Sequence, residues 1–501
     1  MKSKIIIVAT FVALIFTMVS CELERVSYNE ISADNFYQNE DDVNKALTAL
    51  YYPFRGNWGT PYVVDQYSYL VLSEFSAGIM TSRWTDQDYK YYSRHIWTQY
   101  STGWVKTTLQ AHYARYSHLT SITNVIRDIE ASSVSQSLKD QAVAEANVLY
   151  AWMGYILYDA FGPVPIATEE ALTNVQDQIY IPRLSDEEYT ELMLSKLDYV
   201  IDNELLPVRN DDWGRTSLGM ALMLKLKFLM INNRFEEAEV VARKLYSYRG
   251  SIYELQDSYD MILNKANAKN NEIIHVVPCY AVAYYSNLWL HQVCPTYFKG
   301  LDGTNSDDML GGQTFALTWD FFDKLEEDDE RRDTIGDTYI YNGIEVNKNN
   351  NSNLANGGPI PLKIGEDPEK TGIYGSTDMV IFRFADVMLT LAECINRNGG
   401  DKSEAVALVN EIRSRVGLKD LTAADYASTD ALNAAILKER LAEFYMEGSA
   451  RTDKIRFGTF VSDCQALYPD NNGSADYMCR FPIPNTYISE SGGVVVQNPG
   501  Y

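Results

Sequence analysis

Three glutamates at helical spacing are the residues of this sequence that come nearest to a hydrolytic site. Glu439, Glu443 and Glu447 are four residues apart, and a glycosidase needs two carboxyl groups about 5 to 9 Å apart across the scissile bond. Side chains four residues apart on one helix point the same way, so they cannot flank a bond. Three arginines are available to neutralise them: Arg440, Arg451 and Arg456. We therefore predict a structural, ion-paired role for these glutamates and no catalytic site.

Motifs for phosphate, zinc and calcium are absent or incomplete. The sequence has no Gly-Lys dipeptide, which excludes a Walker-type loop, and it has no HExxH or CxxC pair. Residues 302–313 begin like a calcium-binding loop, but Asp307 stands where the pattern needs glycine and Gln313 where it needs a bidentate glutamate. We predict a surface loop at this position, no metal site and no cofactor.

Aromatic residues in irregular segments are the remaining candidates for binding. A sugar has an apolar C–H face that can stack on Trp or Tyr, and its hydroxyls need polar partners. Residues 56–104 interrupt the helical pattern and hold four of the eight tryptophans. The candidates outside regular helices include Trp84, Tyr284, Tyr285, Trp289 and Trp319. By contrast, the helical surroundings of two other tryptophans predict that they belong to the scaffold: Trp104 and Trp152.

The amino terminus has the pattern of an export signal. Lys2 and Lys4 precede a fifteen-residue apolar run over 5–19, which is too short for a membrane span of roughly 20 residues. We predict a signal peptide over 1–20. The sequence Met-Val-Ser-Cys at 18–21 resembles the cleavage box of bacterial lipoproteins, although Met18 stands where leucine is usual. We therefore predict that Cys21 is lipidated and attaches the protein to a membrane.

Charge and cysteine content limit the partners and the covalent structure. The chain carries 43 basic and 68 acidic residues, a formal net charge of −25, so nucleic acid is not expected as a partner. Five cysteines remain beyond Cys21, and an odd number in an exported chain predicts at least one cysteine that is free or bonded to another molecule. Cys394 lies beside the apolar face of a predicted helix and is interpreted as a small buried residue.

The elements that must position these residues are pairs of amphipathic helices, and the clearest pair covers 384–417. Apolar residues recur at helical spacing in its first half: Phe384, Val387, Met388, Leu391 and Ile395. Gly399 ends this helix, Asp401 and Glu404 form a predicted capping box for the next one, and Gly417 ends that. Two helices over roughly 34 residues match a tetratricopeptide-type hairpin, which needs neighbours to bury its apolar faces.

Further hairpins of this kind follow from the same periodicity. The pattern predicts three more pairs and one single helix: 41–54 with 105–129, 138–161 with 185–203, both halves of 216–250, and 430–447. Over residues 251–377 the helical periodicity is lost, and short strands such as 272–277 are predicted instead. The asparagine-rich stretch 342–358 predicts a mobile surface loop. The predicted fold is mainly α: a single domain over 21–501 with a tetratricopeptide-like scaffold, a loop-rich, partly β subregion and a tail over 448–501.

Motifs along the mature chain resemble those of the SusD/RagB family of outer-membrane nutrient-binding lipoproteins. They include FRFADV at 382–387, VNEIRSRVG at 409–417, FGPVP at 161–165, FPIP at 481–484 and QNPGY at 497–501. Phe384, Phe457 and Ala450 depart from the residues usual in that family. The resemblance implies a tetratricopeptide-like scaffold that docks on a TonB-dependent, SusC-like outer-membrane transporter, with a loop-built part that holds a glycan.

The resemblance also directs the search for the ligand. If the hairpins serve the scaffold and the transporter, the ligand must lie among residues 56–104 and 280–319, and these two segments must meet in space. Because the family places its sugar contacts in comparable loops, we predict stacking contacts at Trp84, Tyr285, Trp289 and Trp319. The predicted protein is a non-enzymatic, lipid-anchored surface protein that captures an oligosaccharide or polysaccharide for uptake. A secreted carbohydrate-active hydrolase and a binder of peptide remain the alternatives.

Overall fold

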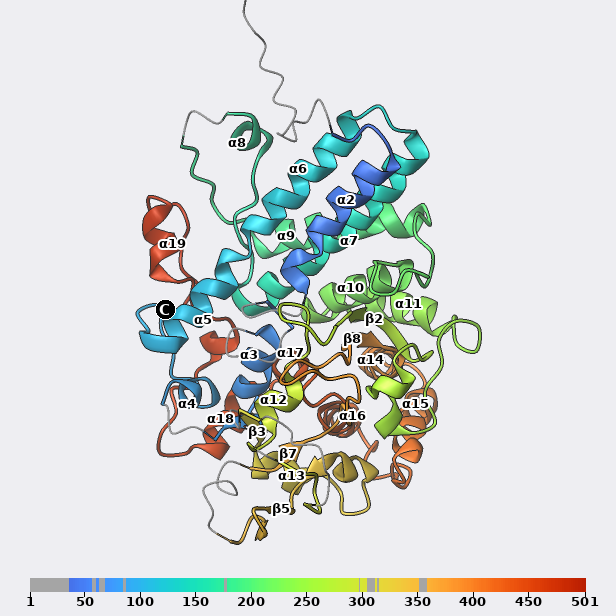
Figure 1. The fold of residues 1–501 in the computed structure, drawn as a ribbon, viewed down its shortest axis with the longest axis vertical. Coiled ribbons are helices and arrows are strands. Elements are labelled where there is room, and N and C mark those ends of the chain that lie inside the picture. Colours follow the sequence, from blue (N-terminus) through green and yellow to red (C-terminus); the bar gives the residue numbers. More distant parts are fainter. Residues whose placement is uncertain are drawn as a thin grey trace, which may run out of the picture.

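Four helical hairpins form the scaffold of the molecule, as predicted. The computed structural model describes residues 36–501 apart from 56–59, 63–67, 84–86, 175–177, 297, 304–310, 313–314 and 351–357. The pairs in contact are α2 (Glu40–Leu50) with α6 (Ser117–Ala131), α7 (Gln136–Phe161) with α9 (Asp186–Asp202), α10 (Leu218–Ile231) with α11 (Phe235–Tyr246), and α14 (Phe384–Arg397) with α15 (Lys402–Arg415). Figure 1 shows them following one another from the top of the view to its lower right.

The hairpins pack as one continuous stack. α6 packs on α7, α9 on α10, and α11 on α14, so the fourth hairpin joins the third directly although more than a hundred residues separate them in sequence. α10 lies between neighbours on several sides and is almost wholly buried. A helix that is apolar all round is expected in such an interior position.

Caps and glycines set the ends of these helices. Ser185 and Glu188 form a capping box at the start of α9. Gly162 ends α7 with a φ of 75°, and Gly399 follows α14 with a φ of 72°, a conformation that residues with a Cβ rarely adopt. The predicted capping box at α15 is wrong in one detail, because Glu404 pairs with Arg243 of α11 at 2.7 Å while Asp401 alone caps the helix.

The segment 56–104, predicted to lack helices, contains two complete helices in its described part. They are α3 (Tyr69–Ser76) and α4 (Gln87–Ser93), with the strand β1 (Met80–Ser82) between them. Every residue of α3 is buried, so its sequence lacks the polar face that a search for amphipathic periodicity requires. The predicted helix over 105–129 is also two helices, α5 (Gly103–Ala114) and α6, with a turn at residues 115–116.

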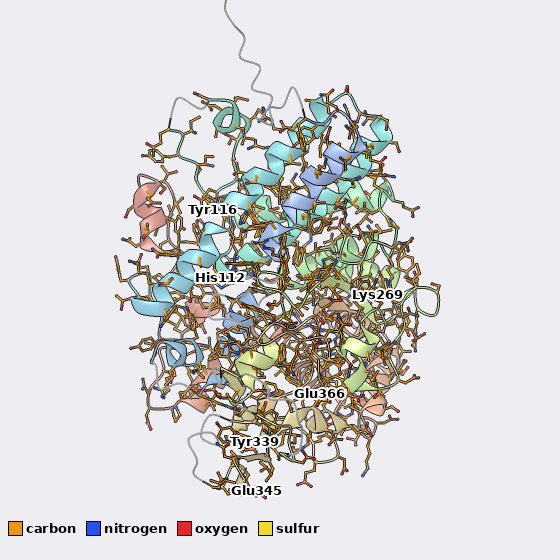
Figure 2. All side chains as sticks on the ribbon, in the orientation of Figure 1. His112, Tyr116, Lys269, Tyr339, Glu345 and Glu366 are labelled. Atoms are coloured by element: carbon orange, nitrogen blue, oxygen red, sulfur yellow. The ribbon has the colours of Figure 1, made fainter. Side chains whose placement is uncertain are left out.

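Short antiparallel strand pairs support the loop-rich part of the chain. β2 (Ile273–Val277) pairs with β8 (Met379–Arg383), which confirms the strand predicted over 272–277. β1 pairs with β3 (Phe315–Leu317), and β4 (Ile335–Gly336) pairs with β7 (Ile360–Pro361). β5 (Tyr339–Tyr341) and β6 (Ile344–Val346) form a hairpin, so part of the predicted mobile loop 342–358 is a strand. Figure 2 labels Tyr339 and Glu345 of this hairpin at the lower end of the molecule.

The carboxyl-terminal part is more regular than its composition predicts. After α16 (Thr429–Glu443) come three α-helices in the described chain, α17 (Ala450–Arg456), α18 (Phe460–Leu467) and α19 (Asn485–Glu490), and one short 3-10 helix, η6 (Asp476–Cys479). The last residues return to the scaffold, where the Asn498 amide donates to the carbonyl oxygens of Phe161 at 3.0 Å and Phe481 at 2.8 Å. The tail therefore closes over the end of α7.

Candidate functional site

The three glutamates of the predicted stripe are ion-paired, as expected, and Glu439 and Glu443 are buried while Glu447 is partly buried, but their partners differ from the predicted ones. Arg331 reaches Glu439 at 2.7 Å, Arg383 reaches Glu443 at 2.5 Å, and Arg383 also reaches Glu447 at 2.8 Å. The arginines expected to neutralise the glutamates instead pair with other carboxylates: Arg440 with Asp386 and Asp453, Arg451 with Asp159, and Arg456 with Glu393 and Asp453.

The predicted stripe is also interrupted. α16 ends at Glu443, so Glu447 lies in the following turn and not on the same helix. Burial alone would raise the pKa of Glu443, but the guanidinium groups of Arg415 and Arg383 hold that pKa well below its usual range. A carboxylate that is surrounded by arginines in the interior has a structural role and cannot contact a substrate.

An exposed loop of tyrosines is the feature that best fits a binding surface. Residues 280–285, which we call the tyrosine loop, include Tyr280, Tyr284 and Tyr285 with exposed fractions of 60 %, 62 % and 43 %. The Tyr280 N–H donates to the Tyr285 carbonyl at 2.7 Å and closes the loop. Tyr284 has a φ of 70°, which few residues other than glycine adopt. The backbone thus holds large aromatic rings in solvent.

Arg55 joins the tyrosine loop to the start of the 56–104 segment. Its guanidinium carbon lies 3.5 Å from the ring centre of Tyr52 and 4.7 Å from that of Tyr285. Its Nη1 also donates to the Tyr285 hydroxyl at 2.9 Å. Tyr52 begins the short helix η1 (Tyr52–Phe54) and is 57 % exposed. We call Tyr52, Arg55 and the three tyrosines of the loop the aromatic surface.

The segments 56–104 and 280–319, which were predicted to meet, are in contact at β1 and β3. In the β1–β3 pair, Met80 lies opposite Leu317 and Ser82 opposite Phe315. The Thr318 N–H donates to the Ile79 carbonyl at 2.8 Å, one residue before β1. The segment 56–104 therefore borders the segment 280–319 along a strand pair, and Arg55, the residue just before the first segment, contacts Tyr285.

The three predicted stacking residues that the structure describes differ in their surroundings. Tyr285 lies in the aromatic surface. Trp289, in α12 (Trp289–Val293), is 2 % exposed and donates its indole N–H to the Pro361 carbonyl at 3.1 Å, so it is a core residue and not a stacking platform. Trp319 is half-buried at the start of α13 (Trp319–Lys324), where Phe322 packs edge-on at 5.9 Å. Trp84 lies outside the described residues.

Sequence reasoning missed Tyr52, Arg55 and Tyr280. Tyr52 and Arg55 flank the end of a predicted helical arm, and Pro53 between them is the signal that the helix stops before them. Of the two tryptophans assigned to the scaffold, Trp152 is 1 % exposed and stacks on Phe54 at 4.0 Å, which confirms its assignment. Trp104, near the start of α5, is instead 39 % exposed.

Cysteines and hydropathy add limited information. Cys279, Cys394, Cys464 and Cys479 are free thiols, so the prediction of at least one free cysteine is confirmed. Cys394 is fully buried against Met230, as predicted. Among the helices that the structure describes, none combines the length and the apolarity that crossing a membrane requires. The calcium-like segment 302–313 lies largely outside the described residues, as does Cys21.

Comparisons with known proteins agree with this architecture. A family model described as the SusD family matches residues 280–501. The chain is 33 % identical to the starch-binding protein SusD of Bacteroides thetaiotaomicron over 139 residues, which is 27 % of this chain and only 23 % of that protein's length. It is 22 % identical to a SusD-like protein of Bacteroides ovatus over 498 residues, covering 94 % of this chain and 85 % of that one.

Solved structures share the fold over most of the chain. Surface glycan-binding protein A from Bacteroides thetaiotaomicron, in complex with laminarihexaose, superposes with a TM-score of 0.74 at 18 % identity, covering 91 % of this chain and 99 % of that one. Its counterpart from Bacteroides uniformis gives 0.73 at 20 % identity, covering 92 % and 99 %. The chain is therefore similar to the SusD family over residues 280–501, and it shares the fold of these surface glycan-binding proteins over most of its length.

Proposed function

We propose that this protein captures a glycan at the cell surface and delivers it to an outer-membrane transporter. The observation that carries the proposal is the aromatic surface, in which four tyrosine rings are between 43 % and 62 % exposed and one arginine holds two of them. Soluble proteins rarely expose several large aromatic side chains together unless a ligand covers them. Tyrosine rings with hydroxyl groups offer both the apolar face and the polar edge that a sugar needs.

The chemistry of this surface suits a neutral or weakly charged oligosaccharide. Ring faces of Tyr284 and Tyr285 can stack on sugar C–H faces, and the tyrosine hydroxyls and Arg55 N–H groups can bond sugar hydroxyls. An open surface of this kind gives modest affinity, about −4 to −8 kcal/mol. A polymer with many repeats, held beside a pore, makes such affinity sufficient because effective concentration replaces intrinsic affinity.

The relatives support the class of ligand. One structural neighbour is described in complex with laminarihexaose and another as a laminarin-binding SusD-like protein, and a sequence relative is named for starch binding. We carry over only the class, an oligosaccharide or polysaccharide. Together with Tyr285, Trp84 and Trp319 remain proposed sugar contacts. Trp289 is buried, and we propose that it supports the nearby loop instead.

Location and partner follow from the family and the amino terminus. We infer that Cys21 carries the lipid, that the protein lies on the outer face of the outer membrane, and that a SusC-like, TonB-dependent transporter receives the glycan. We also infer that the protein is not an enzyme. The supporting observation is that Glu439, Glu443 and Glu447, the carboxylates closest to a hydrolytic pattern, are bound to arginines in the interior.

The proposal is tested by calorimetry with a panel of oligosaccharides that includes laminarihexaose. We expect at least one oligosaccharide to bind wild type, and Tyr285→Ala to weaken that binding about fivefold, the equivalent of about 1 kcal/mol for one stacked ring. Arg55→Met should weaken it as well, because Tyr52 and Tyr285 lose the cation between them.

Tyr100→Ala is the matched control, because Tyr100 is 70 % exposed and lies outside the aromatic surface. Thermal melts of all variants separate lost stacking from lost folding. Wild-type affinity in both Tyr285→Ala and Arg55→Met would show that the site lies elsewhere. Sustained release of new reducing ends from any oligosaccharide of the panel would contradict the binding proposal and support the alternative that the protein is a hydrolase.

A further inference from the structure

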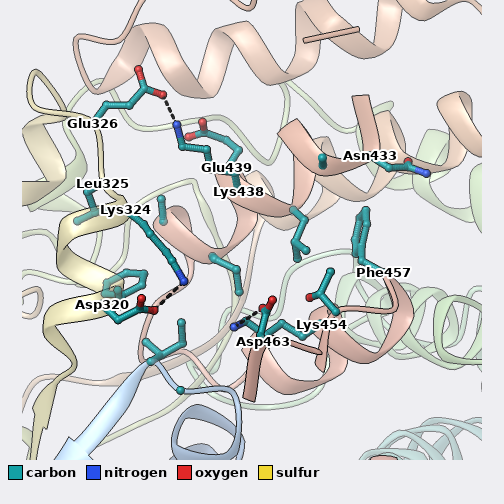
Figure 3. Close-up of a pocket in the computed structure, with 18 of the residues that line it drawn as sticks. Asp320, Lys324, Leu325, Glu326, Asn433, Lys438, Glu439, Lys454, Phe457 and Asp463 are labelled. Carbon is teal, nitrogen blue, oxygen red and sulfur yellow. Dashed lines mark hydrogen bonds and ion pairs between the residues drawn. The ribbon is translucent and has the colours of Figure 1, made fainter. Parts of the chain in front are cut away.

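Cations are neutralised by carboxylates around a cleft of about 590 Å³ between α13 and the region of α16 to α18 (Figure 3). Each of the five cations that line it has a carboxylate partner: Lys324 with Asp320, Lys438 with Glu326, Lys454 with Asp463, Arg331 with Asp329, and Arg397 with Glu393. The lining therefore offers a ligand no uncompensated positive charge. The aromatic surface differs, because Arg55 is the one charged residue among its five members.

Arg55 has no carboxylate partner among the residues that the structure describes. Its side-chain contacts there are with two tyrosines. The ring centres of Tyr52 and Tyr285 lie 3.5 Å and 4.7 Å from its guanidinium carbon, and the Tyr285 hydroxyl accepts a hydrogen bond from Nη1 at 2.9 Å. Aromatic rings attract a cation but do not neutralise its charge. The positive charge of Arg55 is therefore uncompensated at this surface.

The nitrogen of Arg55 that is open to a ligand is Nη2. Nε is buried and has no acceptor in the described part of the chain, and Nη1 already donates to Tyr285. Nη2 has no hydrogen-bond partner within the described residues either, but unlike Nε it is not buried. A ligand that covers the aromatic surface can thus accept a hydrogen bond from Nη2.

The Tyr285 hydroxyl supplies a second donor next to Nη2. Because its oxygen accepts from Nη1, its own proton points away from the guanidinium group. The Tyr285 side chain is 43 % exposed, and its hydroxyl has no acceptor among the described residues. A carboxylate only accepts hydrogen bonds, so it fits two adjacent donors better than a sugar hydroxyl, which must also place its own proton.

Arg55 is held in position without a ligand. It directly follows η1, in which Pro53 restricts the backbone. The rings of Tyr52 and Tyr285 shield its guanidinium group from water, and in such surroundings a charge-assisted hydrogen bond is stronger than in bulk solvent. An anion that binds Arg55 therefore does not have to order this side chain.

The carboxylates next to the aromatic surface are bound to other groups. Glu145 accepts from the Tyr51 hydroxyl at 2.6 Å and pairs with Arg215 at 2.9 Å. Asp378 accepts from the backbone N–H of Cys279, directly before the tyrosine loop, at 2.9 Å. Neither carboxylate contacts Arg55, so the immediate charge that a ligand meets on this surface is positive although the whole chain is acidic.

We propose that the glycan captured at the aromatic surface contains a uronic acid, and that Arg55 determines this specificity. The uronate carboxylate accepts hydrogen bonds from Nη2 of Arg55 and from the Tyr285 hydroxyl, while the tyrosine rings stack on the sugar faces. The inference rests on the proposed function, since it requires that the aromatic surface binds a glycan. Within that class it selects oligosaccharides with a negative charge on the sugar beside Arg55.

The test is calorimetry with tetrasaccharides of galacturonate, glucuronate and mannuronate, each compared with its carboxyl-reduced counterpart. The members of each pair differ in one group per sugar, a carboxylate or a neutral CH2OH. At about 0.15 M salt the Debye length is about 8 Å, so remote acidic residues contribute little. We expect at least one uronate oligosaccharide to bind about threefold or more tightly than its counterpart. If none is preferred, the proposal is overturned.

Variants assign the preference to Arg55. Arg55→Gln should bring the ratio of the two affinities close to one, because stacking contributes equally to both members of a pair. Arg94→Gln is the matched control and should keep the ratio, since Arg94 also lies over a tyrosine ring, that of Tyr468 at 5.3 Å, but outside the aromatic surface. If Arg55→Gln binds neither member, Arg55→Lys decides. It keeps the positive charge, so loss of the preference in that variant would count against the proposal.

Failure of this inference can be told apart from failure of the proposed function. A neutral oligosaccharide such as laminarihexaose that binds wild type and binds Tyr285→Ala more weakly, without any preference for uronates, would overturn the uronate assignment and keep glycan capture. Absence of binding by every oligosaccharide, neutral or acidic, would overturn both.

Discussion

At the scale of single residues, Glu74 shows how a buried carboxyl can join two distant parts of the chain. It lies in α3, within the 56–104 segment, and accepts N–H bonds from Met446 at 3.2 Å and Gly448 at 2.9 Å in the turn after α16. Burial raises the pKa of Glu74 from 4.5 to about 7, although these N–H groups lower it in part. The carboxyl group therefore changes protonation near neutral pH.

This raised pKa predicts the sign of a pH effect on stability. The folded protein holds the Glu74 proton more tightly than the unfolded chain, so its favourable contribution is complete below about pH 4.5 and is lost as pH rises through about 7. Glu74→Gln removes this dependence. The free energy of unfolding of the variant relative to wild type should rise from pH 5 to pH 8, by on the order of 2 to 3 kcal/mol.

Urea denaturation at the two pH values measures this difference, and Glu130→Gln, at an exposed position of α6, is the control for loss of a carboxylate. A difference between Glu74→Gln and wild type that does not change between pH 5 and pH 8 would mean that Glu74 keeps an ordinary pKa. The two backbone N–H groups would then outweigh burial.

At the scale of elements, a buried charge network sets how α16 meets its neighbours. Glu443 at the end of α16 contacts Arg383 of β8, Arg415 of α15 and Arg331 of η4 (Glu330–Thr334). Glu272, next to β2, pairs with both Arg383 and Arg415 at 2.8 and 2.9 Å. The network therefore fixes the crossing between the fourth hairpin and the strand pair that leads into the tyrosine loop.

Removing one carboxylate from this network should be costly. Glu443→Gln leaves three buried guanidinium groups short of one negative charge, and we expect a loss of about 3 to 5 kcal/mol in the free energy of unfolding. Asp41→Asn breaks an exposed pair with Lys45, whose side chains are 73 % and 62 % exposed, and should cost under about 1 kcal/mol. Urea denaturation compares the two variants. Similar small losses in both would refute a structural role for the network.

At the scale of the whole molecule, the hairpin stack and the aromatic surface lie in different parts of the fold. The stack occupies one part of the fold and the aromatic surface lies on loops outside it. Such an arrangement leaves the helical faces available for a protein partner while the loops hold a ligand. Attachment to the membrane is assigned to Cys21, at the amino terminus.

Cys21→Ala should release the protein from membranes. One acyl chain contributes about 0.8 kcal/mol per buried CH2 and holds a protein only marginally, so stable attachment needs a multiply acylated cysteine. Fractionation of cells that lack the partner transporter measures the distribution, and Cys479→Ala is the matched control for loss of a cysteine. Variant protein that still sediments with membranes in those cells would mean that the anchor lies elsewhere.

The sequence by itself determined the hairpins and their order. Apolar spacing, serine caps and glycine ends are local signals, and the fourth hairpin at 384–417 was predicted from them nearly to the residue. The ion-paired role of Glu439 and Glu443 was predictable for a similar reason, since helical spacing excludes a catalytic geometry. The strand 272–277 was also predictable, because four of its residues are the β-branched Ile273, Ile274, Val276 and Val277.

Only the tertiary structure decided which residues meet. Arg55 and Tyr285 are 230 positions apart and Glu74 and Gly448 are 374 apart, so no local pattern relates them. The buried helix α3 has no polar face to reveal it, and the burial of Trp289 depends on Pro361 of β7. Periodicity reports how one element divides its surface between core and solvent. The choice of partner across the core depends on packing among all the elements, which is why the contact of Arg55 with Tyr52 and Tyr285 is visible only in the folded chain.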